Sequence, residues 1–343
     1  MGLNKESGIS LGKWPKGKRN LITDVPGVKV GQVTLNDGDI KTGVTAIIPH
    51  EGDLFHEKLM AGAAVINGFG KSAGLVQIDE LGTLETPIIM TNTLSVGTAL
   101  TASVKYMLSK NPDIGVETGT VNCVVTECND GVLNDIRGLH VTEDHVFQAL
   151  ENACDSFEEG AVGSGTGMCC LGVKGGIGSS SRTFPLDGSD YTIGAIVMSN
   201  FGSDDNLRIG DNFIGPKIDA FLKNEAGKKD KGSIIIIIAT DAPLSDRQLR
   251  RVAKRAMISL GRVGSFSGNG SGDIAVAFST ANRLPHYSKK AILDVKVLHD
   301  EAIDDLFEAS VEAVEEAIIS SLYHAETTEG VRGNKKYGLK TFL

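Results

Sequence analysis

The sequence lacks the features that mark membrane, nucleic-acid-binding and secreted proteins. Its longest uninterrupted apolar run, residues 234–239, is far shorter than the ~20 residues that a helix needs to cross a bilayer. The first twenty residues are polar and contain no apolar stretch of the kind found in a signal peptide. The net charge is −9, and Asp230 interrupts the lysines of residues 228–231. We therefore expect a soluble, cytoplasmic protein with no membrane or nucleic-acid partner.

Cysteine and histidine are few, and they are not spaced as metal ligands. The five cysteines form no paired C-x-x-C motif, and their number is odd. The seven histidines contain no H-E-x-x-H motif. These patterns predict reduced, mostly buried thiols and no metal site.

Aromatic residues are scarce at 5% of the chain, whereas 42 residues are glycine. The hydrophobic content of 41% is too high for a disordered chain and sufficient for a large core. Abundant glycine favours tight turns and close packing of backbone segments.

Segments with β-rich and helical patterns alternate along the chain. Strands are expected near residues 28–33, 43–49, 63–67, 87–91, 123–127, 191–199, 233–240 and 273–279. Helices are expected near residues 96–107, 142–157, 245–260 and 303–322, the third with Met257 on its apolar face. Residues 160–182 are rich in glycine and serine, and no helix or strand is expected there. Residues 223–232 are expected to form a polar loop. The pattern predicts a layered α/β architecture in a single domain over residues 1–343.

Five consecutive isoleucines, residues 234–238, follow a Gly-Ser step. They show no alternation, so the strand should be covered on both faces. Breaking the peptide bond before Ser233 would free an α-amine with a pKa near ~8, a few bonds from the serine Oγ. That amine can take the serine proton, so no histidine is needed. Read alone, however, Gly232-Ser233 is typical of an ordinary turn that enters a sheet.

Other catalytic motifs are incomplete. Residues 69–72 (FGKS) resemble the end of a P-loop, but Val65 stands where its first glycine is required. Residues 163–167 (GSGTG) are a fragment of a dinucleotide fingerprint that follows a helical segment instead of a strand. His50 and His140 are candidates for a Ser-His-Asp triad, but no G-x-S-x-G motif accompanies them.

Motifs along nearly the whole chain, in order, resemble those of one enzyme family, the self-processing L-aminopeptidase/D-esterase and β-peptidyl aminopeptidase family. They are residues 21–28 (LITDVPGV), 41–50 (KTGVTAIIPH), 82–88 (GTLETPI), 91–93 (TNT), 129–131 (NDG), 133–136 (LNDI), 174–182 (KGGIGSSSR), 232–244 (GSIIIIIATDAPL), 268–273 (GNGSGD) and 278–282 (FSTAN).

The resemblance implies a four-layer αββα sandwich, similar in shape to the Ntn hydrolases. It also implies autoproteolysis between Gly232 and Ser233, which would give chains 1–232 and 233–343. The mature enzyme would remove N-terminal residues from short peptides, amides or esters, without metal or organic cofactor, as a homotetramer.

The resemblance also assigns catalytic roles. Ser233 matches the nucleophile, Asn200 the asparagine that stabilises the oxyanion, and Ser271 and Asp273 the pair near the α-amine. Asp273 stands where some relatives have glutamate, which shortens its reach. Without the resemblance, Asn200 is equally typical of a loop cap, and Ser271 and Asp273 of a glycine-rich turn.

Glu127 is our candidate for binding the free ammonium group of the substrate through a charge-assisted hydrogen bond. A structural ion pair is the alternative for this residue. Val132 stands where some relatives have a tyrosine that helps to stabilise the intermediate, and valine cannot donate a hydrogen bond.

Two other functions remain open. An acyltransferase of the ornithine acetyltransferase type shares the self-cleaving layout but uses a threonine nucleophile. The second alternative is a non-catalytic relative of this family that binds a small amine or peptide.

Overall fold

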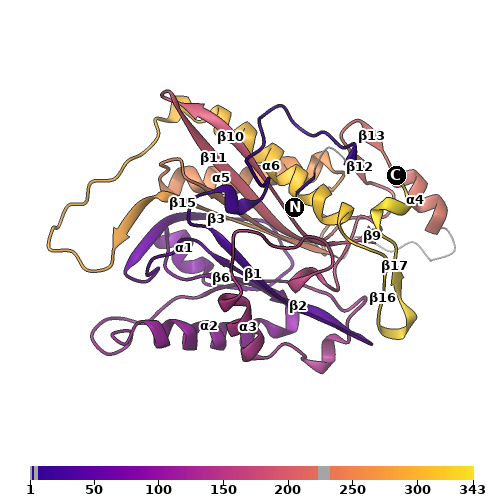
Figure 1. Ribbon diagram of the computed structural model, residues 1–343, viewed down its shortest axis with the longest axis horizontal. Coiled ribbons are helices and arrows are strands. Elements are labelled where there is room, and N and C mark those ends of the chain that lie inside the picture. Colours follow the sequence, from indigo (N-terminus) through magenta and orange to yellow (C-terminus); the bar gives the residue numbers. More distant parts are fainter. Residues whose placement is uncertain (1, 4–6, 223–231) are drawn as a thin grey trace.

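The computed structural model describes residues 2–3, 7–222 and 232–343 (Figure 1). Two β-sheets pack face to face, and helices cover the outer face of each, so the chain forms an αββα sandwich. The polar loop expected over 223–232 lies outside the described residues except for Gly232. No helix within the described ranges is long and apolar enough to cross a membrane.

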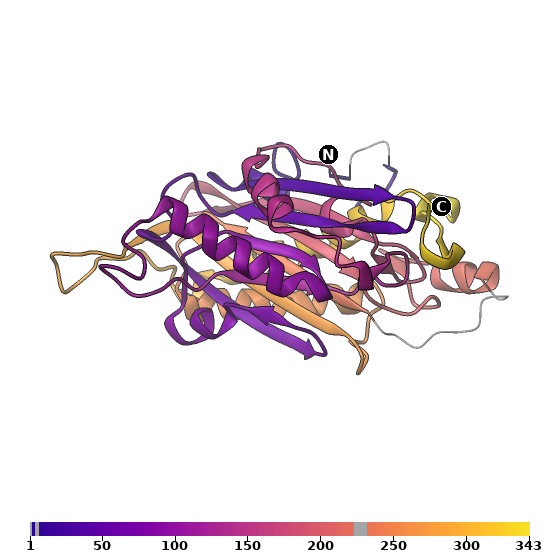
Figure 2. The same ribbon diagram turned by 90° about the horizontal axis from the view of Figure 1, so that it is seen from below.

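The first sheet has five strands under two helices. Its order is β1 (Lys29–Asp37), β2 (Ile40–Ile48), β6 (Ile88–Asn92), β7 (Val124–Cys128) and β4 (Ser72–Ala73). Helices α2 (Val96–Lys110) and α3 (Glu143–Glu151) lie across its outer face (Figure 2). The helix expected to reach residue 157 ends at Glu151, because Cys154 instead exchanges two backbone hydrogen bonds with Val30 of β1.

The second sheet has six strands. Its order is β10 (Gly176–Leu186), β11 (Ser189–Asn200), β14 (Ser233–Thr240), β15 (Gly272–Pro285), β3 (Glu57–Gly68) and β5 (Thr83–Leu84). Helices α5 (Asp246–Arg262) and α6 (Asp304–Tyr323) cover it. The shorter elements are α1 (Leu75–Leu81), α4 (Gly215–Leu222), β8 (Cys169–Cys170), β9 (Val173–Lys174), β12 (Arg208–Ile209), β13 (Asn212–Phe213), β16 (Thr328–Glu329) and β17 (Lys335–Lys336).

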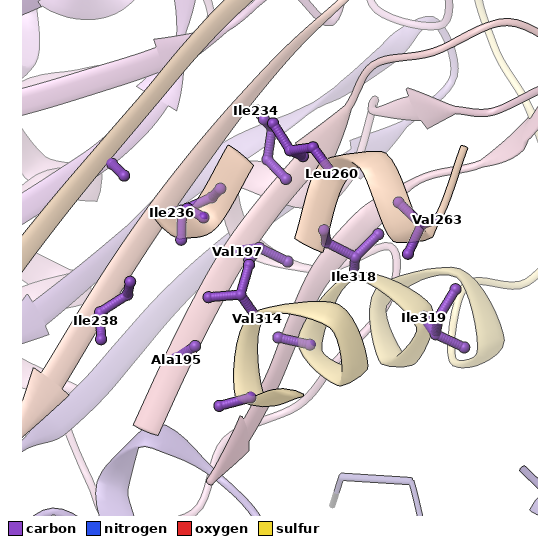
Figure 3. Packing of buried hydrophobic residues seen from close by; sticks show 14 of the residues in the cluster. Ala195, Val197, Ile234, Ile236, Ile238, Leu260, Val263, Val314, Ile318 and Ile319 are labelled. Carbon is purple, nitrogen blue, oxygen red and sulfur yellow. The ribbon is translucent and has the colours of Figure 1, made fainter. Parts of the chain in front are cut away.

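The isoleucine-rich strand β14 lies in the middle of this sheet and is buried on both faces, as expected. Ile234, Ile236 and Ile238 pack toward α5 and α6 (Figure 3), whereas Ile235 and Ile237 belong to the core between the sheets. Each fully buried isoleucine contributes roughly 1.5–3 kcal/mol relative to exposure. The start of β14 is therefore held rigidly from both sides.

Two sequence expectations need correction. Met257 is 57% exposed because it lies one residue, about 100° of helix rotation, beyond the buried Ala256. The glycine- and serine-rich stretch contains the first seven residues of the 11-residue strand β10, for which no strand is expected from the sequence. Glycine is needed there because a Cβ at Gly178 would lie 2.1 Å from the carbonyl oxygen of Ala317 in α6.

Candidate active site

The residues singled out in the sequence meet at one end of the sandwich. Strands β3, β7 and β11 end there, and β14 and β15 begin there. Ser233 is the first residue of β14 and pairs with Asn200, the last residue of β11, and with Gly272, the first of β15. The topology thus brings together segments that are far apart in the sequence.

Ser233 and the carbonyl group before it share one hydrogen-bond donor. The backbone N–H of Gly272 donates to the Ser233 Oγ at 3.3 Å and to the Gly232 carbonyl oxygen at 3.2 Å. Ser233 is only 6% exposed. The serine oxygen and the carbonyl that it would attack are therefore held by the same N–H, which also points at the oxygen where negative charge would develop.

Only glycine fits before Ser233. A Cβ at Gly232 would lie 1.9 Å from the carbonyl oxygen of Asn200 and 2.4 Å from the Cα of Phe201. Both distances are far below van der Waals contact. Any other residue would push the start of β14 away from β11.

The side-chain amide of Asn200 is fixed at both ends. Its Oδ1 accepts from the backbone N–H of Cys169 at 2.8 Å, and its Nδ2 donates to the carbonyl oxygen of Asn129 at 3.0 Å. Because Nδ2 carries two hydrogens and binds no second acceptor within the part of the chain that the structure describes, one N–H is left after the bond to Asn129. A fixed amide donor on the residue paired with Ser233 suits the stabilisation of an oxyanion.

Ser271 and Asp273 are buried on either side of Gly272. The Ser271 hydroxyl donates to the Asp273 Oδ1 at 2.6 Å. Because Gly272 pairs with Ser233, this hydrogen-bonded pair lies beside the position that a freed α-amine would occupy. A carboxylate there favours the charged form of such an amine.

Glu127, at the end of β7, is a buried carboxylate close to the serine. It accepts hydrogen bonds from the Lys71 backbone N–H at 2.8 Å and from the Thr93 hydroxyl. Among the described residues, no lysine or arginine side chain pairs with it. A Cβ at Gly70 would lie 3.3 Å from its Oε1 and 3.4 Å from the Cα of Gly272. Gly70 and Gly272 thus lie between this carboxylate and Ser233.

Val132 is 38% exposed on the loop that begins at Asn129, the hydrogen-bond partner of Asn200. Val132 therefore lies three residues after the backbone group that binds the Asn200 amide, and its side chain cannot donate a hydrogen bond. Neither histidine considered for a triad contacts Ser233. His50 is held by the backbone of Glu57 and Gly52, and His140 by Asp135.

Sequence reasoning identified Ser233, Asn200, Ser271, Asp273 and Glu127, and the structure brings all five to one end of the sandwich. It missed the donors that complete the site, namely the backbone N–H groups of Gly272, Lys71 and Cys169. A backbone donor has no residue signature, so only the fold reveals it.

Comparisons with known proteins identify the family of the chain. Residues 20–336 match the family described as Peptidase family S58. Beta-peptidyl aminopeptidase BapA of Sphingosinicella microcystinivorans is 38% identical over 339 residues, covering 92% of this chain and 84% of that protein.

Two solved structures are also similar. The PH0078 protein from Pyrococcus horikoshii OT3 is 54% identical, with a TM-score of 0.93 and coverage of 98% of this chain and 95% of that one. The L-aminopeptidase D-Ala-esterase/amidase from Ochrobactrum anthropi is described as a prototype for the serine aminopeptidases and a variant of the Ntn hydrolase fold. It is 36% identical, with a TM-score of 0.88 and coverage of 96% of this chain and 93% of that one.

The family match favours a peptidase over an acyltransferase or a non-catalytic binding protein. The chain belongs to peptidase family S58 and is a serine aminopeptidase with an Ntn-hydrolase-like αββα fold.

Proposed function

We propose that this chain cuts itself between Gly232 and Ser233 and then uses the new N-terminal Ser233 to release N-terminal residues from short peptides, amides and esters. The observation that carries the proposal is the N–H of Gly272, which binds both the Ser233 Oγ and the Gly232 carbonyl oxygen. This shared donor supports attack of the Ser233 Oγ on the carbonyl carbon of its own preceding residue.

In the first stage, the Ser233 Oγ attacks the Gly232 carbonyl carbon, and the Gly272 N–H stabilises the charge on its oxygen. The leaving nitrogen takes the serine hydroxyl proton as the C–N bond breaks, an ester replaces the amide, and water hydrolyses the ester. This frees the α-amine of Ser233 and the carboxylate of Gly232. The glycine supplies the close approach to β11 that this geometry requires.

In the second stage, the Ser233 Oγ attacks the carbonyl carbon of the substrate while the α-amine takes the hydroxyl proton. The free N–H of Asn200 stabilises the oxyanion, and Ser271 and Asp273 hold the protonated amine. The departing amine takes the proton, and water then releases the acyl group from Ser233.

Glu127 selects substrates that carry a free amino group. Its buried carboxylate accepts from two neutral donors and pairs with no cationic side chain among the described residues. A substrate ammonium group would supply the missing positive charge. We include β-amino acids among the N-terminal residues released, because the chain is similar to a β-peptidyl aminopeptidase over most of its length. We further propose that the enzyme acts in the cytoplasm as a homo-oligomer.

The first test is the intact mass of the purified protein under denaturing conditions. We expect two species, residues 1–232 and 233–343, for the wild-type chain. Ser233→Ala should give one full-length species with no activity, and Gly232→Ala should be processed slowly or not at all. Ser279→Ala is the matched control, because Ser279 is also buried and lies on the neighbouring strand β15, paired with Thr240 at the opposite end of β14. Processing of Ser233→Ala would exclude the mechanism.

The second test compares substrates. The processed enzyme should hydrolyse p-nitroanilides of L-alanine and of β-homoalanine, and it should leave their N-acetylated forms intact. Equal hydrolysis of the acetylated forms would contradict recognition of a free amine. Hydrolysis of only the α- or only the β-aminoacyl substrate would narrow the substrate class.

A further inference from the structure

Lys174 is a fully buried lysine beneath the candidate oxyanion site, and the mechanism above gives it no role. Its ammonium group donates to three backbone carbonyl oxygens, those of Gly165 at 3.1 Å, Met168 at 2.8 Å and Gly175 at 2.7 Å. Three donors with three acceptors satisfy the ammonium completely. Burial lowers the pKa of Lys174 to about 8, so the group is still mainly charged at pH 7.

One of these carbonyls connects the ammonium to Asn200. The Met168 carbonyl and the Cys169 N–H belong to the same peptide group. Lys174 binds the oxygen of that group, and its N–H donates to the Asn200 Oδ1 at 2.8 Å. A continuous series of hydrogen bonds therefore runs from the ammonium, through one peptide group, to the amide of Asn200.

Such a series has two physical effects. First, β8 and β9 form a short hairpin in which Cys169 pairs with Lys174, so the lysine lies next to the Met168–Cys169 peptide group. By binding the carbonyl oxygen of this peptide group, the ammonium fixes the orientation of the N–H that binds Asn200. Second, the positive charge of the ammonium beside the Met168 carbonyl polarises this peptide group, which makes the Cys169 N–H a stronger donor. This stronger donor in turn polarises the side-chain amide of Asn200. The remaining N–H of Asn200 would then bind an oxyanion more strongly.

We propose that Lys174 is a positioning residue that orients and polarises Asn200 through the Met168–Cys169 peptide group. It touches neither the substrate nor Ser233 in this proposal. The inference rests on the proposed role of Asn200 in stabilising the oxyanion, and it adds the group that prepares Asn200 for that role.

A double-mutant cycle tests the proposal on processed enzyme, with kcat expressed per active site titrated with a serine-directed acylating reagent. Asn200→Ala should lower kcat about 100- to 1,000-fold, as loss of an oxyanion donor does elsewhere. Lys174→Met, which keeps the chain length without the charge, should lower kcat roughly tenfold and leave KM within about twofold. The variant with both changes should match Asn200→Ala within about twofold, because Lys174 acts only through Asn200.

Control variants separate this role from a loss of stability. Ser180→Ala removes a buried hydroxyl that binds the Ala313 carbonyl in α6, and it should leave kcat unchanged. If Lys174→Met fails to fold, the same double-mutant cycle can be measured with Lys174→Gln. Because glutamine keeps two donors, this variant should show a smaller loss of kcat.

The outcomes are distinct. A further tenfold loss in the double variant, or an unchanged kcat in the single Lys174 variant, would overturn the role of Lys174 while the proposed function stands. An inactive wild-type chain, or an Asn200→Ala variant with full activity, would instead refute the proposed function or its oxyanion site.

Discussion

Replacing Glu127 by glutamine should impair substrate binding and leave self-cleavage intact. Glutamine has nearly the same volume, its carbonyl oxygen can still accept from the Lys71 N–H, and the Thr93 hydroxyl can turn to accept from the new amide. The buried site therefore keeps its shape and its hydrogen bonds, and only the negative charge is lost.

The size of the effect follows from the bond that is lost. A hydrogen bond to a charged group contributes about 1.5–3 kcal/mol, and every 1.4 kcal/mol is about tenfold. We therefore expect kcat/KM for an aminoacyl p-nitroanilide to fall about 10- to 150-fold. In the proposed mechanism, the Gly232–Ser233 peptide bond is cut without any free amine, so the intact mass should show processing as complete as in the wild-type chain.

Glu85 offers a matched control. It is equally buried, but it forms an ion pair with Lys58 and accepts from the Asn122 N–H, so its charge is already neutralised. Glu85→Gln should lose stability without a change in kcat/KM. If Glu127→Gln kept its wild-type kcat/KM, or lost processing together with activity, the assignment of Glu127 to the substrate ammonium would be refuted.

Two further predictions concern buried charges. Arg182 is fully buried and paired with Glu316 at 2.7 Å and Glu312 at 3.3 Å. Arg182→Met leaves these two carboxylates without their partner, so it should lower the free energy of unfolding, measured in urea, by about 3–5 kcal/mol. A loss below about 1 kcal/mol would contradict this prediction. Burial raises the pKa of Asp130 from 3.8 to about 6, so the folded chain holds this proton at pH values where the unfolded chain has lost it. Unfolding measured at pH 4 and pH 6.5 should therefore show the wild-type chain losing about 2–3 kcal/mol relative to Asp130→Asn as the pH rises. An equal pH dependence in the two chains would show that Asp130 titrates normally.

Much of the architecture could be predicted from local patterns. The isoleucine run identified a strand buried on both faces, and β14 is that strand. A helix is expected from residue 245, where serine is a residue type favoured at a helix N-cap, and the Ser245 hydroxyl accepts from the Gln248 N–H at the start of α5. Hydrophobic periodicity reports which faces are buried, and capping reports where a helix begins, so both signals lie within one segment.

The strand β10 could not be predicted in this way. Glycine and serine have low strand propensity, and they occur there because α6 packs almost directly on the backbone. Arg182, at the end of that stretch, would be expected on the surface from its type alone. Its burial depends on two glutamates of α6 that are 130 and more residues away.

The candidate site, like the fold, could be predicted from the sequence only in part. The sequence alone places Ser233 before a buried strand, and the order of the motifs predicts the family, which in turn assigns Ser233 and the other candidate catalytic side chains. Only the tertiary structure showed that the Gly272 N–H binds both the serine and the carbonyl before it, that Glu127 has no cationic partner among the described residues, and that Lys174 is connected to Asn200. The physical reason is that side-chain chemistry belongs to a residue, whereas the direction of a backbone donor and the partner of a buried charge depend on segments that meet only in the folded chain.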